Sequence, residues 1–438
     1  MNMYDLIQKK RDGFSLSTEE LKYIVNGYTQ GEIKDYQMSA FLMAVYFQKM
    51  NKKETVDFTL AMASSGEMLD LRGIEGIKVD KHSTGGIGDK TTLILAPMLA
   101  SLGIPVAKMS GRGLGYTGGT IDKLESFPGF STSVTKENFI RNVNRHRICV
   151  AGQTENLAPA DKKIYALRDV TATVDNVSLI ASSIMSKKLA SGADVIVLDV
   201  KCGTGAFMKT KEDACLLAKT MVQIGEDAGR KTMALITDMN QPLGYMVGNS
   251  LEVFEAIKVL KGEGERRLEE LCLQLASWMM IYGGYEKDLN CAYEKLKGTI
   301  KNHQALDKMA EWVESQGGSR ESVYEGKGLK KATKQKEVRA SEAGYLYCRN
   351  ATEVGKAALM LGAGRVCKED KIDLGAGIEF LKKNGDKVEK GEPFALLHYE
   401  EEEKAEKAQE ILQTAYEVRK ESFEECALIK KVITIKDC

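Results

Sequence analysis

The fold is decided by the stretch Lys81-His82-Ser83-Thr84-Gly85-Gly86-Ile87-Gly88-Asp89-Lys90-Thr91-Thr92 and by a second stretch of the same character, Ser110-Gly111-Arg112-Gly113-Leu114-Gly115-Tyr116-Thr117-Gly118-Gly119-Thr120. Both are dense in glycine and hydroxyl residues. Glycine lets the backbone approach a ligand closely, so that N–H groups, hydroxyls and an ammonium can converge on an anion. We therefore predict a phosphate site formed by two loops. The alternative is a pair of tight turns without a ligand, which two such loops so close together disfavour.

The segments around these loops alternate between strand and helix patterns. A strand-like segment at 77–80 precedes the first loop, and a helical run at 91–102 follows it. Further strands are expected at 106–109, 147–150, 194–200 and 232–236. Repetition of strand, loop and helix predicts a parallel sheet. Ligands of such sheets bind at the carboxyl ends of the strands, where both loops would lie.

Helical patterns dominate two other parts of the chain. Residues 1–65 read as short helices with apolar faces, which need a later helix or a second subunit to cover them. Residues 161–190 return to helix, and the sheet resumes afterwards. We infer two structural units with several crossings between them, and ligands commonly bind in such clefts. A polar linker is expected at 325–339, and strands with a hairpin turn at 385–392 follow it.

Composition excludes several classes of protein. At 438 residues the chain should form more than one domain, and 43% hydrophobic content suits a sizeable core. The formal net charge is zero, so no global field favours nucleic acid or an anionic membrane. Nine cysteines without a CxxC pair and only four histidines argue against a disulfide framework and a structural zinc site. We expect a cytoplasmic protein without a membrane span.

Candidate phosphate ligands lie in or beside the two loops. The side-chain donors are Lys81, Ser83, Thr92, Ser110 and Thr120. Lys108 and Met109 end the strand before the second loop, and Lys108 either points into the cleft or lies on the surface. His82 lies beside the anion site, where it serves in binding or proton transfer or is a structural imidazole.

A second cluster falls in the helical segment 161–190. Ser183 and Lys187 are four residues apart and share a helical face. Lys187 either snorkels past neighbouring isoleucines or faces a polar pocket. Arg168 precedes them, with an ion pair to Asp169 or Asp161 as its alternative role. A Ser, a Lys and an Arg suit a flat ligand with carbonyl oxygens, such as a pyrimidine.

The second loop also contains a GxGxxG pattern at 113–118. Such a pattern after a strand is typical of dinucleotide-binding enzymes, although it is weak evidence alone. The chain opens with helices rather than with a βαβ unit, and no acidic residue ends a second strand at the required distance. A nicotinamide-dependent dehydrogenase is therefore a disfavoured alternative.

The run Ser-Gly-Arg-Gly-Leu-Gly-x-Thr-Gly-Gly-Thr-Ile-Asp-Lys-Leu-Glu at 110–125 resembles the diagnostic motif of the thymidine and pyrimidine-nucleoside phosphorylases. Matching runs occur at 81–89, 159–169, 182–188 and 241–244. The resemblance implies an α/β fold with an all-helical N-terminal domain, a larger mixed α/β domain and a C-terminal α+β barrel-like part. The corresponding ranges are 1–65 with 161–192, 77–154 with 193–325, and 340–438. It also implies a homodimer formed through the helical domains, and no organic cofactor.

The resemblance assigns the two clusters to two substrates. Inorganic phosphate would bind to Lys81, Ser83, Thr92, Lys108, Met109, Ser110 and Thr120. The nucleoside would bind to Ser183 and to three residues that also act in catalysis, His82, Arg168 and Lys187. Phosphate would attack C1′ of uridine, thymidine or deoxyuridine with inversion, and Lys108 suggests this tolerant type over the alternative, a thymidine-specific phosphorylase. An anthranilate-type phosphoribosyltransferase shares the fold but would need magnesium and a diphosphate sugar.

Two residues depart from the family pattern. Tyr116 stands where the family usually has His, which puts any role of that position in doubt. Lys90 stands where related enzymes that bind potassium have Thr. The potassium ligands implied by the resemblance are Gly88, Leu243, Met246 and Glu255, besides position 90. An ammonium at position 90 would replace the cation and pair with Glu255, so we expect weaker potassium dependence.

Overall fold

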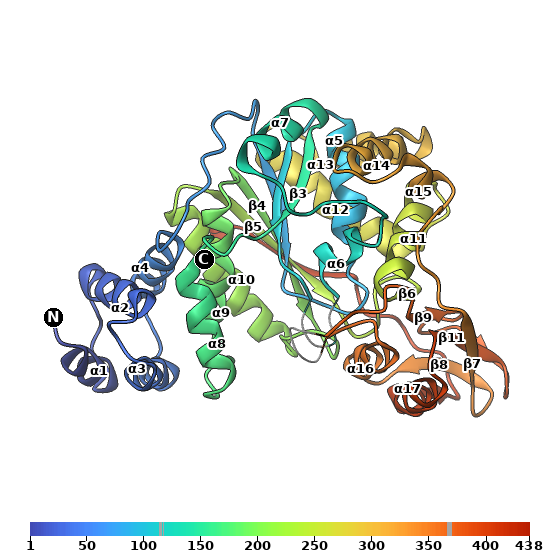
Figure 1. The fold of residues 1–438 in the computed structure, drawn as a ribbon. Helices are drawn as coiled ribbons and strands as arrows, with labels where there is room; N and C mark the ends of the chain where they lie inside the picture. The colour runs from blue at the N-terminus through green and yellow to red at the C-terminus, as the bar shows by residue number, and fades with distance from the viewer. Residues whose placement is uncertain (114–115, 117, 366–369) are drawn as a thin grey trace.

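The computed structural model describes residues 1–113, 116, 118–365 and 370–438. Three positions of the GxGxxG pattern, 114, 115 and 117, thus lie outside the described residues. A six-stranded sheet forms the centre of the molecule (Figure 1). A helical bundle lies on one side of it and a smaller unit with two sheets lies on the other.

The helical domain combines the first four helices with two later ones. They are α1 (Met3–Arg11), α2 (Thr18–Gln30), α3 (Asp35–Gln48), α4 (Lys52–Ala63), α8 (Pro159–Asp169) and α9 (Val177–Ala190). Phe41, Phe58 and Ile164 belong to one buried cluster that joins the early helices to α8 and α9. The later helices therefore cover apolar faces of the early ones, which is one of the two possibilities that the sequence left open. Figure 1 shows α8 and α9 between the early helices and the sheet.

The central sheet has the strand order β13-β5-β4-β1-β2-β3. Its parallel strands are β1 (Val79–Ser83), β2 (Val106–Ser110), β3 (Ile148–Gly152), β4 (Val195–Cys202) and β5 (Lys231–Asp238). The predicted strands are confirmed within a few residues. Because β1 and β2 are neighbours and parallel, both glycine loops leave the sheet at the same edge.

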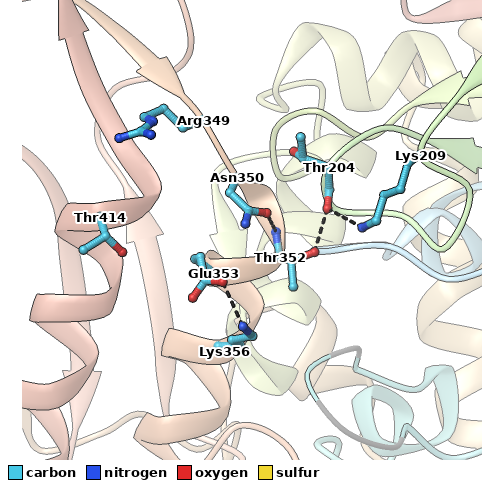
Figure 2. Close-up of a pocket in the computed structure, with 8 residues that line it drawn as sticks. All are labelled: Thr204, Lys209, Arg349, Asn350, Thr352, Glu353, Lys356 and Thr414. Carbon is cyan, nitrogen blue, oxygen red and sulfur yellow. Dashed lines mark hydrogen bonds and ion pairs between the residues drawn. The ribbon is translucent and has the colours of Figure 1, made fainter.

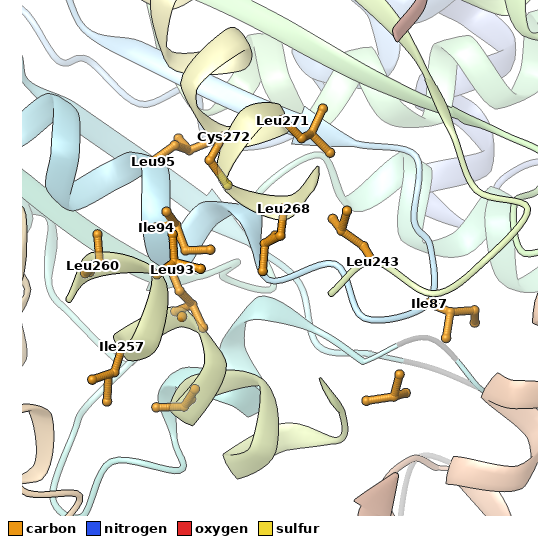
Figure 3. Close-up of a cluster of buried hydrophobic side chains, with 14 of the residues drawn as sticks. Ile87, Leu93, Ile94, Leu95, Leu243, Ile257, Leu260, Leu268, Leu271 and Cys272 are labelled. Atoms are coloured by element: carbon orange, nitrogen blue, oxygen red, sulfur yellow. The ribbon is translucent and has the colours of Figure 1, made fainter. Parts of the chain in front are cut away.

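Helices on the sheet surround α5 (Thr91–Ser101), which follows the first loop. Its first ten residues are buried, and Leu93, Ile94 and Leu95 pack among leucines of neighbouring helices (Figure 3). Although α5 is apolar all round, no helix of the described ranges is long and apolar enough to cross a membrane. The other helices of this domain are α6 (Thr120–Leu124), α7 (Lys136–His146), α10 (Lys211–Asp227), α11 (Asn249–Leu260), α12 (Arg266–Gly283), α13 (Leu289–Lys301), α14 (Gln304–Ser315) and α15 (Arg320–Tyr324).

The C-terminal unit has two small antiparallel sheets with α16 (Ala351–Leu361) and α17 (Glu402–Ala415). One sheet has the order β10-β8-β12 and the other β6-β9-β11-β7. Their strands are β6 (Met246–Val247), β7 (Lys334–Arg339), β8 (Gly344–Cys348), β9 (Gly377–Phe380), β10 (Lys387–Val388), β11 (Pro393–Tyr399) and β12 (Tyr416–Arg419).

Two expectations for this region need correction. The segment expected to be a linker contains β7, which pairs with β11 along its length. The range 340–438 was expected to form the C-terminal part, but its last strand, β13 (Ile429–Ile433), pairs antiparallel with β5 at the edge of the central sheet. The pairing buries Ile433 and covers the edge of β5, which would otherwise be open.

Candidate functional site

The first glycine loop connects β1 to α5 and is anchored by Lys81. Its Nζ lies 2.5 Å from Oγ1 of Thr91, 3.5 Å from Oδ1 of Asp89 and 3.3 Å from Oδ2 of Asp199. Burial alone would lower the pKa of Lys81, but the carboxylates of Asp89 and Asp199 raise it above its usual value. Lys81 is therefore a fixed positive charge beneath the loop.

The two glycine loops lie against each other in space. Lys123, in the helix α6 that follows the second loop, donates from Nζ to the carbonyl of Asp89 in the first loop at 2.7 Å. Thr120 is the first residue of α6 and Ser110 is the last residue of β2. Both side chains are partly exposed, as is that of Ser83. These hydroxyls thus border the edge at which the loops meet.

The remaining predicted phosphate ligands are more buried. Thr92 lies in the first turn of α5 and is 6% exposed. Lys108 is not on the surface: its Nζ donates to Oδ1 of Asp80 at 3.0 Å and to the carbonyl of Lys81. Burial lowers the pKa of Lys108 to about 8, although the charge of Asp80 opposes that shift.

Asp80 joins the strands that lead into the glycine loops to the helical domain. Its Oδ2 accepts from Nζ of Lys188 on α9 at 2.8 Å, and the same ammonium donates to the carbonyl of Met109 at 3.1 Å. Burial would raise the pKa of Asp80, but the charges of Lys108 and Lys188 outweigh it and lower the pKa. A single buried carboxylate therefore ties α9 to β1 and β2.

The predicted second cluster forms on α9. Nζ of Lys187 lies 3.2 Å from Oγ of Ser183 and 2.5 Å from Oδ2 of Asp161 on α8. The Lys187 side chain is 25% exposed and that of Asp161 is 5% exposed. Lys187 therefore faces a polar partner rather than snorkelling past the isoleucines. Because Lys188 follows it directly and contacts the carbonyl of Met109, this cluster lies near the second glycine loop.

Arg168 lies in the last turn of α8, with its guanidinium turned toward backbone carbonyls. Its N–H groups donate to the carbonyls of Thr173, Val174 and Leu179 at 3.2, 2.6 and 3.1 Å. These bonds, and not the ion pair considered from the sequence, hold the side chain, which lowers the cost of burying it. Burial lowers the pKa of Arg168, and it stays a cation.

His82 follows Lys81 in β1 and is partly buried. Burial lowers its pKa well below the usual value, and the positive charges of Lys188, Lys108 and Lys187 add to that effect. His82 is therefore neutral at physiological pH, and its ring can donate one hydrogen bond and accept another.

Three of the four residues assigned to potassium besides position 90 place an oxygen on the ammonium of Lys90. Its Nζ donates to the carbonyl of Leu243 at 3.0 Å, to that of Met246 at 2.6 Å and to Oε2 of Glu255. The carbonyl of Gly88 accepts the backbone N–H of Lys90 at 2.9 Å. With an ammonium at their meeting point, these residues do not fit a potassium ion.

Three residues of the site were missed from the sequence as site members, Asp80, Asp161 and Lys188. Asp161 lies within the matching run 159–169, and Lys188 lies within the matching run 182–188. Their membership in these runs could have indicated both residues. Asp80 had no such signal, because its partners Lys108 and Lys188 lie 28 and 108 residues away in the chain.

Tyr116 lies outside this cluster. A Cβ at Gly355 would lie 3.0 Å from Cδ2 of Tyr116, so the tyrosine ring packs against α16. A cavity of about 640 Å³ lies at the N-terminal end of α16, between that helix and the loop after β4 (Figure 2). It is lined by Thr204, Lys209, Arg349, Asn350, Thr352, Glu353, Lys356 and Thr414, and by no residue of the two predicted clusters.

Comparison with known proteins gives consistent matches along the chain. Residues 4–66 match the helical bundle domain of a glycosyl transferase family, and residues 75–306 match the a/b domain of a glycosyl transferase family. Residues 345–419 match the pyrimidine nucleoside phosphorylase C-terminal domain.

Curated relatives match over nearly their full length. The pyrimidine-nucleoside phosphorylase of Bacillus subtilis (strain 168) is 58% identical over 398 residues, which cover 91% of this chain and 92% of the relative. That of Geobacillus stearothermophilus is 55% identical, over 92% of this chain and 93% of the relative. The crystal structure of anthranilate phosphoribosyltransferase from Thermus thermophilus superposes with a TM-score of 0.58 at 17% identity, covering 71% of this chain and 98% of that one, which shows a shared fold alone.

Proposed function

The chain belongs to the pyrimidine-nucleoside phosphorylase family, and from this premise we propose that it catalyses the reversible phosphorolysis of uridine, thymidine and deoxyuridine. The products are the free base and the α-anomer of ribose or deoxyribose 1-phosphate. No organic cofactor is required, because the nucleophile is inorganic phosphate itself.

One observation carries this proposal. Asp80 accepts from Lys108 on the phosphate side and from Lys188 on the helix that carries Ser183 and Lys187. This carboxylate thereby joins the proposed anion site to the helix that carries the cluster suited to a pyrimidine, which supports placing the two substrates side by side. A nucleoside bound between them would present C1′ to the phosphate.

Phosphate is bound by Lys81 and by the loop hydroxyls, with Lys108 adding charge from below. It attacks C1′ from the face opposite the base, through a transition state that resembles an oxocarbenium ion. The bond from C1′ to the base nitrogen breaks as the bond from the phosphate oxygen forms. Because only one displacement occurs, the configuration inverts once, and exclusion of water from the cleft suppresses hydrolysis.

The departing base gains negative charge, which the second cluster stabilises. Lys187 supplies an ammonium and Arg168 a guanidinium, which has more N–H donors than the three carbonyls engage. Neutral His82 donates a hydrogen bond to a base oxygen. Ser183 orients the pyrimidine edge through its hydroxyl.

The alternative is a phosphorylase specific for thymidine. Lys108 favours the broader enzyme, because the family resemblance links Lys at this position to tolerance of both uridine and thymidine. In the structure the Lys108 ammonium lies at the base of the site, bonded to Asp80. Relative kcat/KM for uridine and thymidine separates the two alternatives.

We also propose that two copies associate through their helical domains. Tyr36, Ala40, Met43 and Phe47 are spaced to form one apolar stripe along α3. Tyr36 is 74% and Phe47 72% exposed, although α8 and α9 already cover the other face of the bundle. A second copy of this domain would bury the stripe.

The deciding experiment mixes the protein with phosphate and either uridine, thymidine or deoxyuridine, and measures free base and sugar 1-phosphate. Equal release of both products that requires phosphate is the expected result. Base release without phosphate would indicate hydrolysis instead. Absence of release from all three nucleosides would overturn the proposed function.

A further inference from the structure

The segment 242–246 links the central sheet to the C-terminal unit and is held by two lysine ammoniums. On one side, Nζ of Lys90 donates to the carbonyls of Leu243 and Met246. On the other, Nζ of Lys383 donates to the carbonyls of Pro242 and Gly244 at 2.8 and 2.7 Å. Along this segment, the carbonyls thus accept from Lys383 and from Lys90 in turn.

Glu255 on α11 completes the set of oxygens around Nζ of Lys90. We call this set, the carbonyls of Leu243 and Met246 with the carboxylate of Glu255, the Lys90 cradle. Oε2 of Glu255 accepts from Lys90 and from the backbone N–H of Met246, and its Oε1 accepts from the backbone N–H of Tyr245. Lys90 is 1% and Glu255 3% exposed, so their charges neutralise each other away from water. Unlike Lys383, Lys90 has both carbonyls and a carboxylate around its Nζ.

The backbone around the Lys90 cradle is closely packed. Gly244 has φ of +73°, and a Cβ there would lie 2.5 Å from Oε2 of Glu255. Gly88 has φ of +75°, and a Cβ there would lie 2.7 Å from the carbonyl of Leu243. Carbonyl and carboxylate oxygens that meet at one buried point are the ligands of a hard cation. An ammonium with three donors satisfies the three oxygens equally well.

We propose that Lys90 is a built-in cation that replaces the potassium ion implied by the family resemblance, so that this protein needs no monovalent metal to hold its first glycine loop against segment 242–246 and α11. A second positive charge in the same cradle would repel the ammonium at short range and low dielectric. Because Lys90 belongs to the loop itself, the link cannot dissociate as a bound ion does.

The first test uses the unmodified protein. Thermal midpoint and turnover are measured in potassium, sodium and choline chloride at equal ionic strength. Both quantities are expected to be the same in the three salts. A saturable rise of either quantity with potassium, absent with choline, would overturn the proposal without bearing on the identity of the substrates.

The second test restores the site with Lys90→Thr, which removes the ammonium and adds a neutral oxygen. This variant is expected to melt lower in choline and to regain stability with potassium in a saturable way, as linkage requires of a bound ligand. If it folds only with potassium, refolding yield against potassium concentration gives the same readout. Lys383→Thr is the matched control, expected to lose stability equally in all three salts. A potassium-insensitive Lys90→Thr, or a potassium-rescued Lys383→Thr, would contradict the assignment.

Discussion

Replacing Lys187 by Met separates its chemical role from its structural one. The change removes the ammonium that lies 2.5 Å from Oδ2 of Asp161. The other oxygen of Asp161 is buried and has no hydrogen-bond partner among the described residues. The variant therefore leaves a nearly buried carboxylate uncompensated. Loss of one member of a fully buried pair costs about 3–5 kcal/mol.

That figure must be reduced, because the Lys187 side chain is 25% exposed and water screens part of the interaction. We expect the free energy of unfolding to fall by about 1–3 kcal/mol. Turnover should fall on the order of 10²-fold, since the charge on the departing base loses its cation. That loss corresponds to about 2.7 kcal/mol in the barrier.

The double variant Lys187→Met with Asp161→Asn distinguishes the two effects. It removes the stranded carboxylate, so stability should return while turnover stays low. Urea unfolding gives the stability, and uracil release from uridine at saturating phosphate gives the turnover. Lys162→Met, which breaks only an exposed ion pair with Glu155, is the control and should change neither quantity appreciably. Recovery of turnover in the double variant, or unchanged turnover in Lys187→Met, would refute the role of Lys187 in leaving-group stabilisation.

Three further results are expected. Because the pKa of Lys108 is lowered to about 8 by burial, its charge is lost as pH rises through that value; the phosphate KM should increase there, and Lys108→Met should lack that increase. Because the folded-state pKa of His82 lies well below the usual value, the unfolded chain binds a proton that the folded chain does not once pH falls below about 6.5. Stability should decline over that acid range, and urea midpoints should decline less for His82→Asn. Phe47→Glu places a charge in the apolar stripe of α3 and should yield monomers in sedimentation experiments, whereas the exposed, off-stripe Gln30→Glu should not.

Local patterns in the sequence determined most of the fold and the membership of both proposed substrate clusters. Strand and helix periodicities are short-range signals, so β1, β2 and α9 could be located from their own residues. The spacing of Ser183 and Lys187 fixes a shared helical face whatever the tertiary structure, and the structure places their polar atoms 3.2 Å apart. The placement of the glycine loops could also be predicted, because each loop follows a strand and neighbouring parallel strands end at the same edge of the sheet.

The tertiary structure decided most of the charge pairs. Asp80 meets Lys188 across 108 residues, whereas the pairing of Lys90 with Glu255, 165 residues away, was expected only through the family resemblance. No periodicity encodes such pairs, since they depend on strand order and on where α9 crosses the sheet. The return of β13 to β5 has the same cause, because an apolar strand pattern specifies burial but not the edge that receives it. The sequence thus determined which residues are proposed to bind ligands, while long-range packing decided how their charges are balanced.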